Sequence, residues 1–280
     1  MTTPEAPLIG AAAAPALHVM SWNIRRRMSL PALRAADRWS SRAPRVQDLL
    51  STERPTLLGL QEALTDQAEL VRAALGADYR LIGQGRSAEG RGEGCPIVYD
   101  AARLELLDWE QAALSDSPTR PGSTSWGNII PRILVSAIFE DLATSRRFHA
   151  INTHLDHLSP RSRLRSAQAL GEAAAASGLP AVITGDFNAP AGSAPLRALL
   201  AEGEYRDAWS AAQERRSQEW DTYANYRAPR QRRGRIDWIL TGPAFRVDRA
   251  AINARQHQGG WASDHLPVQA EMTLGEGVHA

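Results

Sequence analysis

Residues that could carry out metal-assisted or acid/base chemistry recur in this chain beside short apolar runs. These residues, each with its run, are Asn23 (HVMSWN), Glu62 (TLLGLQE), His154 (FHAINTHLD), Asp186 and Asn188 (PAVITGDFN), Asp237 (RIDWILTG), and Asp264 and His265 (SDHLPVQAEM). An apolar run of this length is typical of a buried strand, and polar residues at strand ends can converge on one rim of a sheet. The pattern therefore predicts an active site at such a rim.

Three of these side chains have the chemistry of ligands for a hard metal ion. Asn23, Glu62 and Asp264 offer oxygen ligands, which suit Mg²⁺ or Mn²⁺ better than zinc. Because Mg²⁺ usually keeps water and substrate phosphate beside one or two carboxylates, we expect a phosphate ester as the substrate.

The remaining side chains suit the handling of protons. Asp186 and Asn188 are two positions apart after VIT, so both would point the same way and could hold and activate a water for attack on phosphorus. Asp237 could accept the Nδ1 proton of His265 and fix its tautomer. The residue types leave open whether Asp186 or His265 is the general base.

The elements between these residues predict stacked sheets covered by helices. Helical spacing of apolar residues occurs in RVQDLLSTE, EALTDQAELVRAALG and SPRSRLRSAQALGEAAAAS, and further strands are expected in CPIVYD, RLELLDW and RILVSAIFED. This mixed order argues against a regular βαβ repeat. Residues 211–235 have no clean period and predict a long loop, which ends in an arginine cluster at 227–235.

Length and composition bound the class of protein. We expect one domain over residues 17–275 after a flexible N-terminus, residues 1–16, in a chain of 280 residues. A hydrophobic fraction of 43% is that of an ordinary globule, and a net charge of +1 gives no overall argument for nucleic acid or an anionic membrane surface. Cys95 is the single cysteine, which excludes an internal disulfide framework and a cysteine-based zinc cluster. With no stretch of membrane-spanning length and no secretory signal pattern, we expect a cytoplasmic monomer without integral membrane association.

The blocks SWN, LQE, NTHLDH, GDFN, RIDWIL and SDHLPV, in this order, resemble the endonuclease/exonuclease/phosphatase (DNase I-like) superfamily from about His18 to about Met272. The resemblance implies an α+β fold, a four-layer α/β/β/α sandwich of two mostly antiparallel sheets flanked by helices, with Mg²⁺-dependent phosphate-ester cleavage at one end. It assigns roles by position: Asn23 and Glu62 on the metal side, His154 in contact with phosphate, Asp186 and Asn188 with water and phosphate, and Asp237 and Asp264 flanking the catalytic His265.

The middle of the chain resembles a bacterial branch of this superfamily. The segments NIR, GQGRSAEGRGEGCPIVYD and SWGNIIPRI carry this likeness, and they make Arg25, Arg86, Glu93 and Arg132 candidate pocket residues. In many abasic-site nucleases the position two after the Asn is an acidic metal ligand, whereas here it is Arg25. This departure counts against abasic-site nuclease activity and favours contact between Arg25 and a substrate anion.

The substrate class stays unresolved at this level. The expected reaction is attack of an activated water on a phosphodiester or phosphomonoester, and a nuclease acting on DNA or RNA is the main alternative. The arginine cluster could neutralise a polyanion, or it could be a solvated loop. Aromatic residues that could stack on a base or a sugar are Trp126, Tyr223, Tyr226 and Trp261.

Two further alternatives are weaker. NTHLDH nearly matches the H-x-H-x-D-H zinc signature of metallo-β-lactamase-like hydrolases, but Asn152 stands in place of the first His, and GDFN and SDH would be unexplained. A non-catalytic binding module of the same fold is disfavoured because every matched acid/base position holds a competent residue.

Overall fold

The computed structural model describes residues 6–28 and 34–275, and within them two sheets lie face to face. The first sheet has the order β10-β12-β13-β1-β2-β4-β3, with bounds Glu214–Arg215, Phe245–Ile252, Val268–Leu274, Ala16–Asn23, Leu57–Gln61, Ile97–Asp100 and Tyr79–Ile82 respectively. The second has the order β5-β6-β7-β8-β11-β9, with bounds Leu104–Ala113, Ile133–Asp141, Arg146–His154, Ala181–Asp186, Asp237–Thr241 and Arg206–Asp207. Most pairings are antiparallel.

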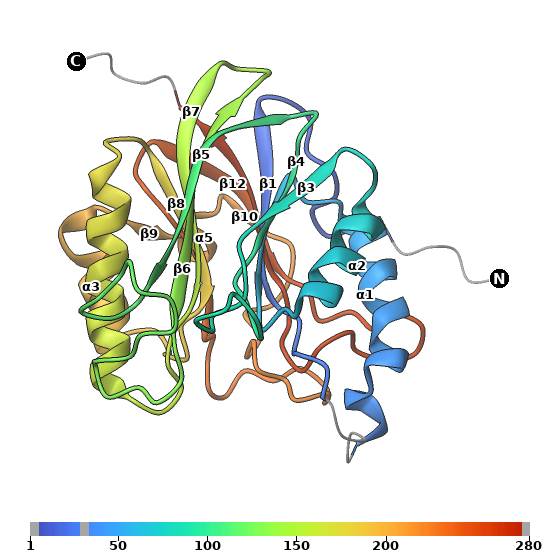
Figure 1. The fold of residues 1–280 in the computed structure, drawn as a ribbon. Helices are drawn as coiled ribbons and strands as arrows, with labels where there is room; N and C mark the ends of the chain where they lie inside the picture. The colour runs from blue at the N-terminus through green and yellow to red at the C-terminus, as the bar shows by residue number, and fades with distance from the viewer. Residues whose placement is uncertain (1–5, 29–33, 276–280) are drawn as a thin grey trace.

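Helices cover the outer face of each sheet, as Figure 1 shows with α1 and α2 on one side and α3 on the other. The helices are α1 (Trp39–Glu53), α2 (Thr65–Leu75), α3 (Pro160–Ala176), α4 (Ala194–Leu200) and the short α5 (Ala208–Ala211), with single 3₁₀ turns at Ala35–Asp37 and Ala201–Gly203. One apolar cluster joins α1 and α2 to the first sheet, and another joins α3 and α4 to the second. The expected four-layer α/β/β/α sandwich is therefore confirmed.

Strand β1 shows why its sequence reads as a continuous apolar run. Leu17 and Val19 belong to the cluster between the sheets, whereas Met20 and Trp22 belong to the cluster beneath α1 and α2. Successive side chains of a strand point to opposite faces, so a strand buried on both faces has no polar face to reveal.

A polar contact joins the two sheets inside the sandwich. Asn152 on β7 donates to the carbonyl of Leu60 at 2.7 Å, and its own Oδ1 accepts from Gln61 on β2 and from Thr184 on β8 at 2.7 and 3.0 Å. Gly59 lies at the same level, where an added Cβ would lie 2.2 Å from Thr184 Oγ1 and 2.6 Å from Asn152 Oδ1. Glycine is therefore required in the run TLLGLQE. Asn152 is fully buried in this contact, so the interpretation of NTHLDH as a zinc signature was wrong, as the sandwich fold itself also shows.

The strand directions bring the polar ends of six strands to one end of the sandwich. β1 runs parallel to β2, and β7 parallel to β8, so the residues that follow these four strands emerge together. β13 is antiparallel to β1 and β11 antiparallel to β8, so the residues at their starts join the same end. In the register of β8, Asp186 lies beside His154 on one side and Asp237 on the other.

Other expectations meet the structure less closely. The helix expected over residues 45–53 begins earlier, at Trp39, and strands β3 and β12 and helix α4 were not among the expected elements. Of residues 211–235, expected to be a long loop, residue 211 ends α5 and the rest form that loop, with the two-residue β10 inside it. No helix among the described residues has both the length and the apolarity needed to cross a membrane.

The segment expected to be a flexible N-terminus, residues 1–16, lies partly outside the described residues. Its described part begins at residue 6, and there the amides of Leu8, Ile9 and Gly10 donate to the buried carboxylate of Glu53 at 2.9 to 3.1 Å. The backbone just before β1 is thus held against the end of α1.

Candidate active site

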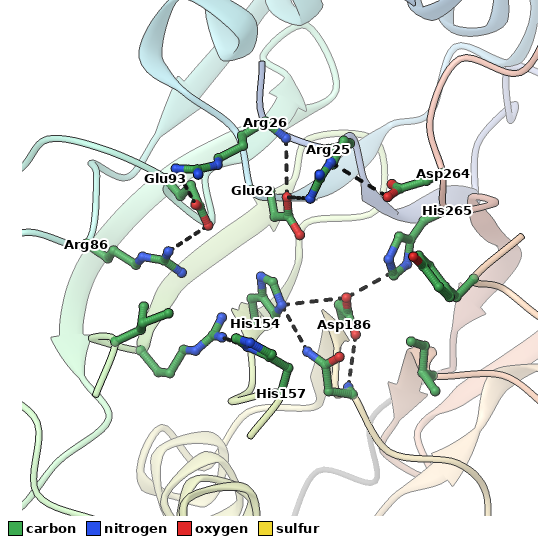
Figure 2. Close-up of a pocket in the computed structure, with 15 residues that line it drawn as sticks. Arg25, Arg26, Glu62, Arg86, Glu93, His154, His157, Asp186, Asp264 and His265 are labelled. Carbon is green, nitrogen blue, oxygen red and sulfur yellow. Dashed lines mark hydrogen bonds and ion pairs between the residues drawn. The ribbon is translucent and has the colours of Figure 1, made fainter. Parts of the chain in front are cut away.

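A cavity of about 360 Å³ opens at the end of the sandwich where the polar strand ends meet. Figure 2 shows carboxylates, imidazoles and guanidinium groups pointing into it from both sheets. Its lining contains most of the residues singled out in the sequence: Arg25, Glu62, Arg86, Arg132, His154, Asp186, Asn188, Asp264 and His265. Asn23 and Asp237 do not line the cavity but lie directly behind residues that do.

Asp186 is the carboxylate at the centre of this site. Its Oδ2 accepts from Asn23 Nδ2 at 3.0 Å, and its Oδ1 accepts from the backbone amide of Asn188 at 2.9 Å. Asn188 has a positive φ of 48°, a conformation that asparagine tolerates better than most residues. This turn directs the Asn188 amide onto Nε2 of His154 at 3.0 Å and onto the carbonyl of Leu155 at 3.1 Å. The end of β8 thus orients two of the proposed functional side chains.

His265 is held by an acid from the opposite sheet. Nδ1 of His265 lies 2.9 Å from Asp237 Oδ2 and 3.8 Å from Asp186 Oδ2. Trp22 Nε1 donates to the carbonyl of His265 at 3.1 Å, which fixes the backbone from which the imidazole projects. The carboxylate–imidazole contact expected from the sequence is therefore present.

The charges of this cluster shift its protonation. Burial lowers the pKa of His265, but the carboxylates of Asp237 and Asp186 outweigh burial and hold that pKa well above its ordinary value. Burial, reinforced by the charge of Asp237, raises the pKa of Asp186 to about 7. Burial and the neighbouring Arg132 and Arg86 guanidinium groups keep the pKa of His154 well below its ordinary value. His265 is thus the cationic imidazole of the site and His154 the neutral one.

Two acidic residues on the other side of the cavity lie around a guanidinium group. Nη1 of Arg25 is 3.7 Å from Glu62 Oε2, and its Nε is 3.7 Å from Asp264 Oδ2 (Figure 2). Glu62 also accepts from Asn23 Nδ2 at 3.1 Å, whereas Asn23 Oδ1 accepts from the backbone amide of Arg25 at 3.0 Å. The carboxylate oxygens of Glu62 and Asp264, which were proposed as metal ligands, therefore both lie near the guanidinium group of Arg25.

A second group of possible metal ligands lies within the proton-handling cluster. One ligand atom from each of Asp186, Asp237 and His265 lies within 4.8 Å of the others, which is close enough to share an ion. A protonated imidazole cannot bind a metal, and the hydrogen bond between Asp237 and His265 already uses one atom of each. Hard oxygen ligands and access from the cavity favour Glu62 and Asp264 instead.

Basic side chains form the remaining wall of the cavity. Arg132 is buried, its Nε lies 3.3 Å from Asp156 Oδ2, and its Nη2 lies 3.0 Å from His157 Nδ1. Its Nη1 is buried and has no hydrogen-bond partner among the described residues, so a donor is left for a ligand. Arg86 pairs with Glu93 at 2.8 Å, and Arg26 pairs with the same carboxylate at 3.2 Å.

Some residues of the cavity carried no recognisable signal in the sequence. Arg26, Ile130, His157 and Ile236 line it and were not singled out, because each lies on a loop whose path no periodicity predicts. Among the aromatic residues proposed for stacking, Tyr223 lines the cavity and its ring lies 5.0 Å from that of His265.

The other aromatic residues do not line the cavity. Trp126 is buried and donates to Asp116 at 2.7 Å, so the expectation that it stacks on a base was wrong. Tyr226 donates its hydroxyl to Asp37 at 2.8 Å, and Trp261 packs against the central apolar cluster.

Comparisons with known proteins agree with this fold. A family model described as "Endonuclease/Exonuclease/phosphatase family" matches residues 20–265. A crystal structure of an endonuclease/exonuclease/phosphatase family protein from Bacteroides thetaiotaomicron has a TM-score of 0.87 at 27% identity, over 93% of this chain and 98% of that one. The mannosyl-6-phosphatase of the same organism has a TM-score of 0.86 at 27% identity, over 92% of this chain and 99% of that one. Protein angel of Drosophila melanogaster is 30% identical over 162 residues, which are 55% of this chain and 45% of that protein, so the matched region spans less than half of that curated relative.

Proposed function

The chain belongs to the endonuclease/exonuclease/phosphatase family, and from this premise we propose that it hydrolyses a phosphomonoester of a small molecule by attack of an activated water. The fold is that of a superfamily whose members include hydrolases of phosphate esters.

The observation that carries the proposal is the position of Asp186 between two imidazoles at the wall of the cavity. Asp186 Oδ2 lies 3.6 Å from Nε2 of His154 and 3.8 Å from Nδ1 of His265, and all three side chains line the cavity. A carboxylate beside a cationic and a neutral imidazole provides an acceptor for a water proton next to donors for phosphate oxygens.

These positions suggest a division of labour. Asp186 is the general base, since it faces the cavity and Asn23 and Asn188 hold both of its oxygens in place. His265, kept protonated by Asp237, donates to a phosphate oxygen and offsets the charge that develops there. His154 and Asn188 position the phosphate from the opposite side. This assignment favours Asp186 over His265 as the base, the choice that the sequence left open.

The residues present fit a divalent metal ion. Glu62 and Asp264 supply carboxylate oxygens, and Asn23 lies beside Glu62, a donor set that Mg²⁺ or Mn²⁺ prefers. Bound there, the ion would neutralise negative charge on the phosphate oxygens. Arg25 reaches the same carboxylates, so its guanidinium would have to turn toward the substrate when the ion binds.

The basic wall favours a monoester over a diester. A phosphomonoester carries up to two negative charges on its phosphate, and the cavity offers Arg25, Arg26, Arg86 and Arg132 beside the protonated His265. The likeness to a mannosyl-6-phosphatase that is covered over almost its whole length points the same way. A small phosphorylated molecule is therefore the substrate that best matches this cavity.

A hydrolysis screen with added Mg²⁺ or Mn²⁺ tests the proposal. Sugar phosphates and p-nitrophenyl phosphate are compared with bis(p-nitrophenyl) phosphate and short oligonucleotides, and Asp186→Asn is the matched inactive control. We expect phosphate release from monoesters that stops in EDTA and in the variant. Faster cleavage of diesters or oligonucleotides would replace the proposal with the nuclease alternative.

A further inference from the structure

The long loop between α5 and β11 contains a second cavity next to the candidate active site. This cavity has a volume of about 190 Å³, and Tyr223 lines both it and the main cavity. Four arginines also line it: Arg227, Arg230, Arg232 and Arg233. We call this cavity the arginine pocket.

The arginines of this loop fall into two kinds. Arg235 is buried, forms a two-pronged contact with Asp207 at 2.7 and 2.9 Å, and lies over the ring of Trp238 at 4.2 Å, so it anchors the loop to the second sheet. The four arginines of the pocket are exposed, and within residues 6–28 and 34–275 none of their side chains forms an ion pair or hydrogen bond. Arg235 therefore has the structural role of anchoring the loop, whereas the contacts of the other four arginines give them no such role.

The backbone that carries these arginines is held in a fixed shape. The carboxylate of Asp221 accepts from the amides of Arg232, Arg233 and Gly234 at 2.8 to 3.1 Å, and its own amide donates to the carbonyl of Arg230 at 2.6 Å. These backbone amides thus occupy the hydrogen-bonding oxygens of Asp221, the acidic residue that lines the pocket. Within the described residues it forms no ion pair with the guanidinium groups, and its single negative charge offsets only part of the four positive charges that line the pocket.

The part of the loop that carries the arginines is held next to His265 and Asp237 on both of its sides. Tyr223 forms a β-bridge with His265, and the amide of Leu266 donates to the carbonyl of Thr222 at 2.8 Å. After the last arginine, the amides of Ile236 and Asp237 donate to Thr222 Oγ1 at 3.0 and 3.2 Å. The arginine pocket thus has a fixed position relative to His265 and Asp237.

Four unpaired guanidinium groups around one small cavity repel one another unless an anion lies between them. Planar guanidinium groups bind phosphate with two parallel hydrogen bonds, which makes phosphate the best match. The groups surround one cavity instead of following a groove, and the net charge of the chain is only +1, so a compact anion fits better than a polynucleotide backbone.

We propose that the arginine pocket binds a second phosphate group of the substrate, so that the preferred substrate is a small molecule carrying two phosphates. This rests on the proposed function, since the first phosphate must lie in the main cavity. Tyr223, shared by both cavities, would contact the part of the molecule between the two phosphates.

Binding measurements without turnover test the pocket separately from catalysis. Calorimetry in EDTA would compare fructose 1,6-bisphosphate with fructose 6-phosphate, and adenosine 3′,5′-bisphosphate with adenosine 5′-monophosphate, so that the spacing of the phosphates varies. We expect at least one bisphosphate to bind about tenfold tighter than its monophosphate, and Arg230→Ala/Arg232→Ala/Arg233→Ala to remove most of that advantage. The triple variant Arg80→Ala/Arg147→Ala/Arg246→Ala, which removes three arginines of β3, β7 and β12, should keep it.

Two results would overturn the inference. One is that no bisphosphate binds more tightly than its monophosphate, or that the loop variant weakens both equally. The other is a preference for single-stranded oligonucleotides that grows with their length, falls with salt and is lost in the loop variant, which would make the loop a polynucleotide surface. Hydrolysis of the monophosphates with added metal, measured in parallel, separates the two proposals. Cleavage without a bisphosphate preference removes only the pocket. The preference without cleavage removes the proposed function and leaves the pocket as part of a site for a bisphosphate that is bound but not hydrolysed.

Discussion

Asp237 and His265 meet across the two sheets of the sandwich, with Asp237 Oδ2 2.9 Å from His265 Nδ1. Asp237 opens β11 in the second sheet, whereas His265 precedes β13 in the first. The pair that sets the charge of the site therefore also joins its two halves.

The first prediction concerns this pair. Asp237→Asn removes the charge that keeps His265 protonated, so kcat should fall by about a hundredfold or more while KM changes little. Steady-state kinetics on the best monoester of the screen measures this. A loss confined to KM would show that Asp237 acts on substrate binding instead.

The second prediction separates the two candidate bases. If Asp186 takes the proton of the attacking water, Asp186→Asn should lower kcat further than His265→Asn does, because the second change leaves the base in place. Single-turnover rates of both variants at saturating substrate decide the order. The reverse order would make His265 the base and Asp186 a positioning residue.

The third prediction locates the metal. Glu62→Gln removes one charge with little change in volume, so Mg²⁺ or Mn²⁺ affinity measured by calorimetry without substrate should fall about tenfold or more. Asp237→Asn serves as the comparison, since it lies in the other possible ligand group. If Asp237→Asn weakens metal binding and Glu62→Gln does not, the metal lies in the cluster of Asp186, Asp237 and His265.

The fourth prediction concerns Arg25, which lies 3.7 Å from each of Glu62 and Asp264. Its guanidinium competes with a metal ion for these carboxylates, so Arg25→Ala should tighten metal binding by about tenfold, and Arg25→Lys should tighten it less. The same calorimetric titration checks both variants. Weaker metal binding in Arg25→Ala would mean that Arg25 orients the ligands instead of competing with the ion.

The fifth prediction concerns pH and stability. Burial lowers the pKa of His18 to about 4, and its Nδ1 lies 2.8 Å from the carbonyl of Gly10. In the unfolded chain His18 titrates near its ordinary pKa of about 6.5, so below that pH the unfolded state binds the extra proton and stability falls. The loss develops between about pH 6.5 and pH 4 and amounts to roughly 3 kcal/mol.

Chemical denaturation at pH 7.5 and pH 5 measures the part of this loss that develops above pH 5, roughly 2 kcal/mol. His18→Gln should be less stable than the wild type at pH 7.5, and its stability should depend less on pH over this range. An equal loss of stability in both proteins between the two pH values would assign the acid sensitivity to other groups.

The sequence predicted the strands and the convergence of their ends because both depend on local pattern. An apolar run that ends in a polar residue shows its strand and its rim position together, as TLLGLQE does for β2 and Glu62. Ile130, His157 and Ile236 reach the cavity through loops, where position depends on contacts distant in sequence. The arginines at 227–235 were visible as a cluster, but the difference between anchoring Arg235 and the exposed arginines needed the structure.

The contact between Asn152 and Gly59 has a consequence for how such a protein can diversify. Asn152 is two residues before His154, and Gly59 is three residues before Glu62. The contact between Asn152 and Gly59, which separates the sheets, therefore lies just beneath the cavity residues at the ends of these strands. The distance between the two sheets thus does not depend on the identity of the cavity residues. The loops after β3 and before β11 can therefore be exchanged, shortened or given other charges without altering the distance between the sheets. New specificity can be engineered in these loops while Asn152 and Gly59 are left unchanged.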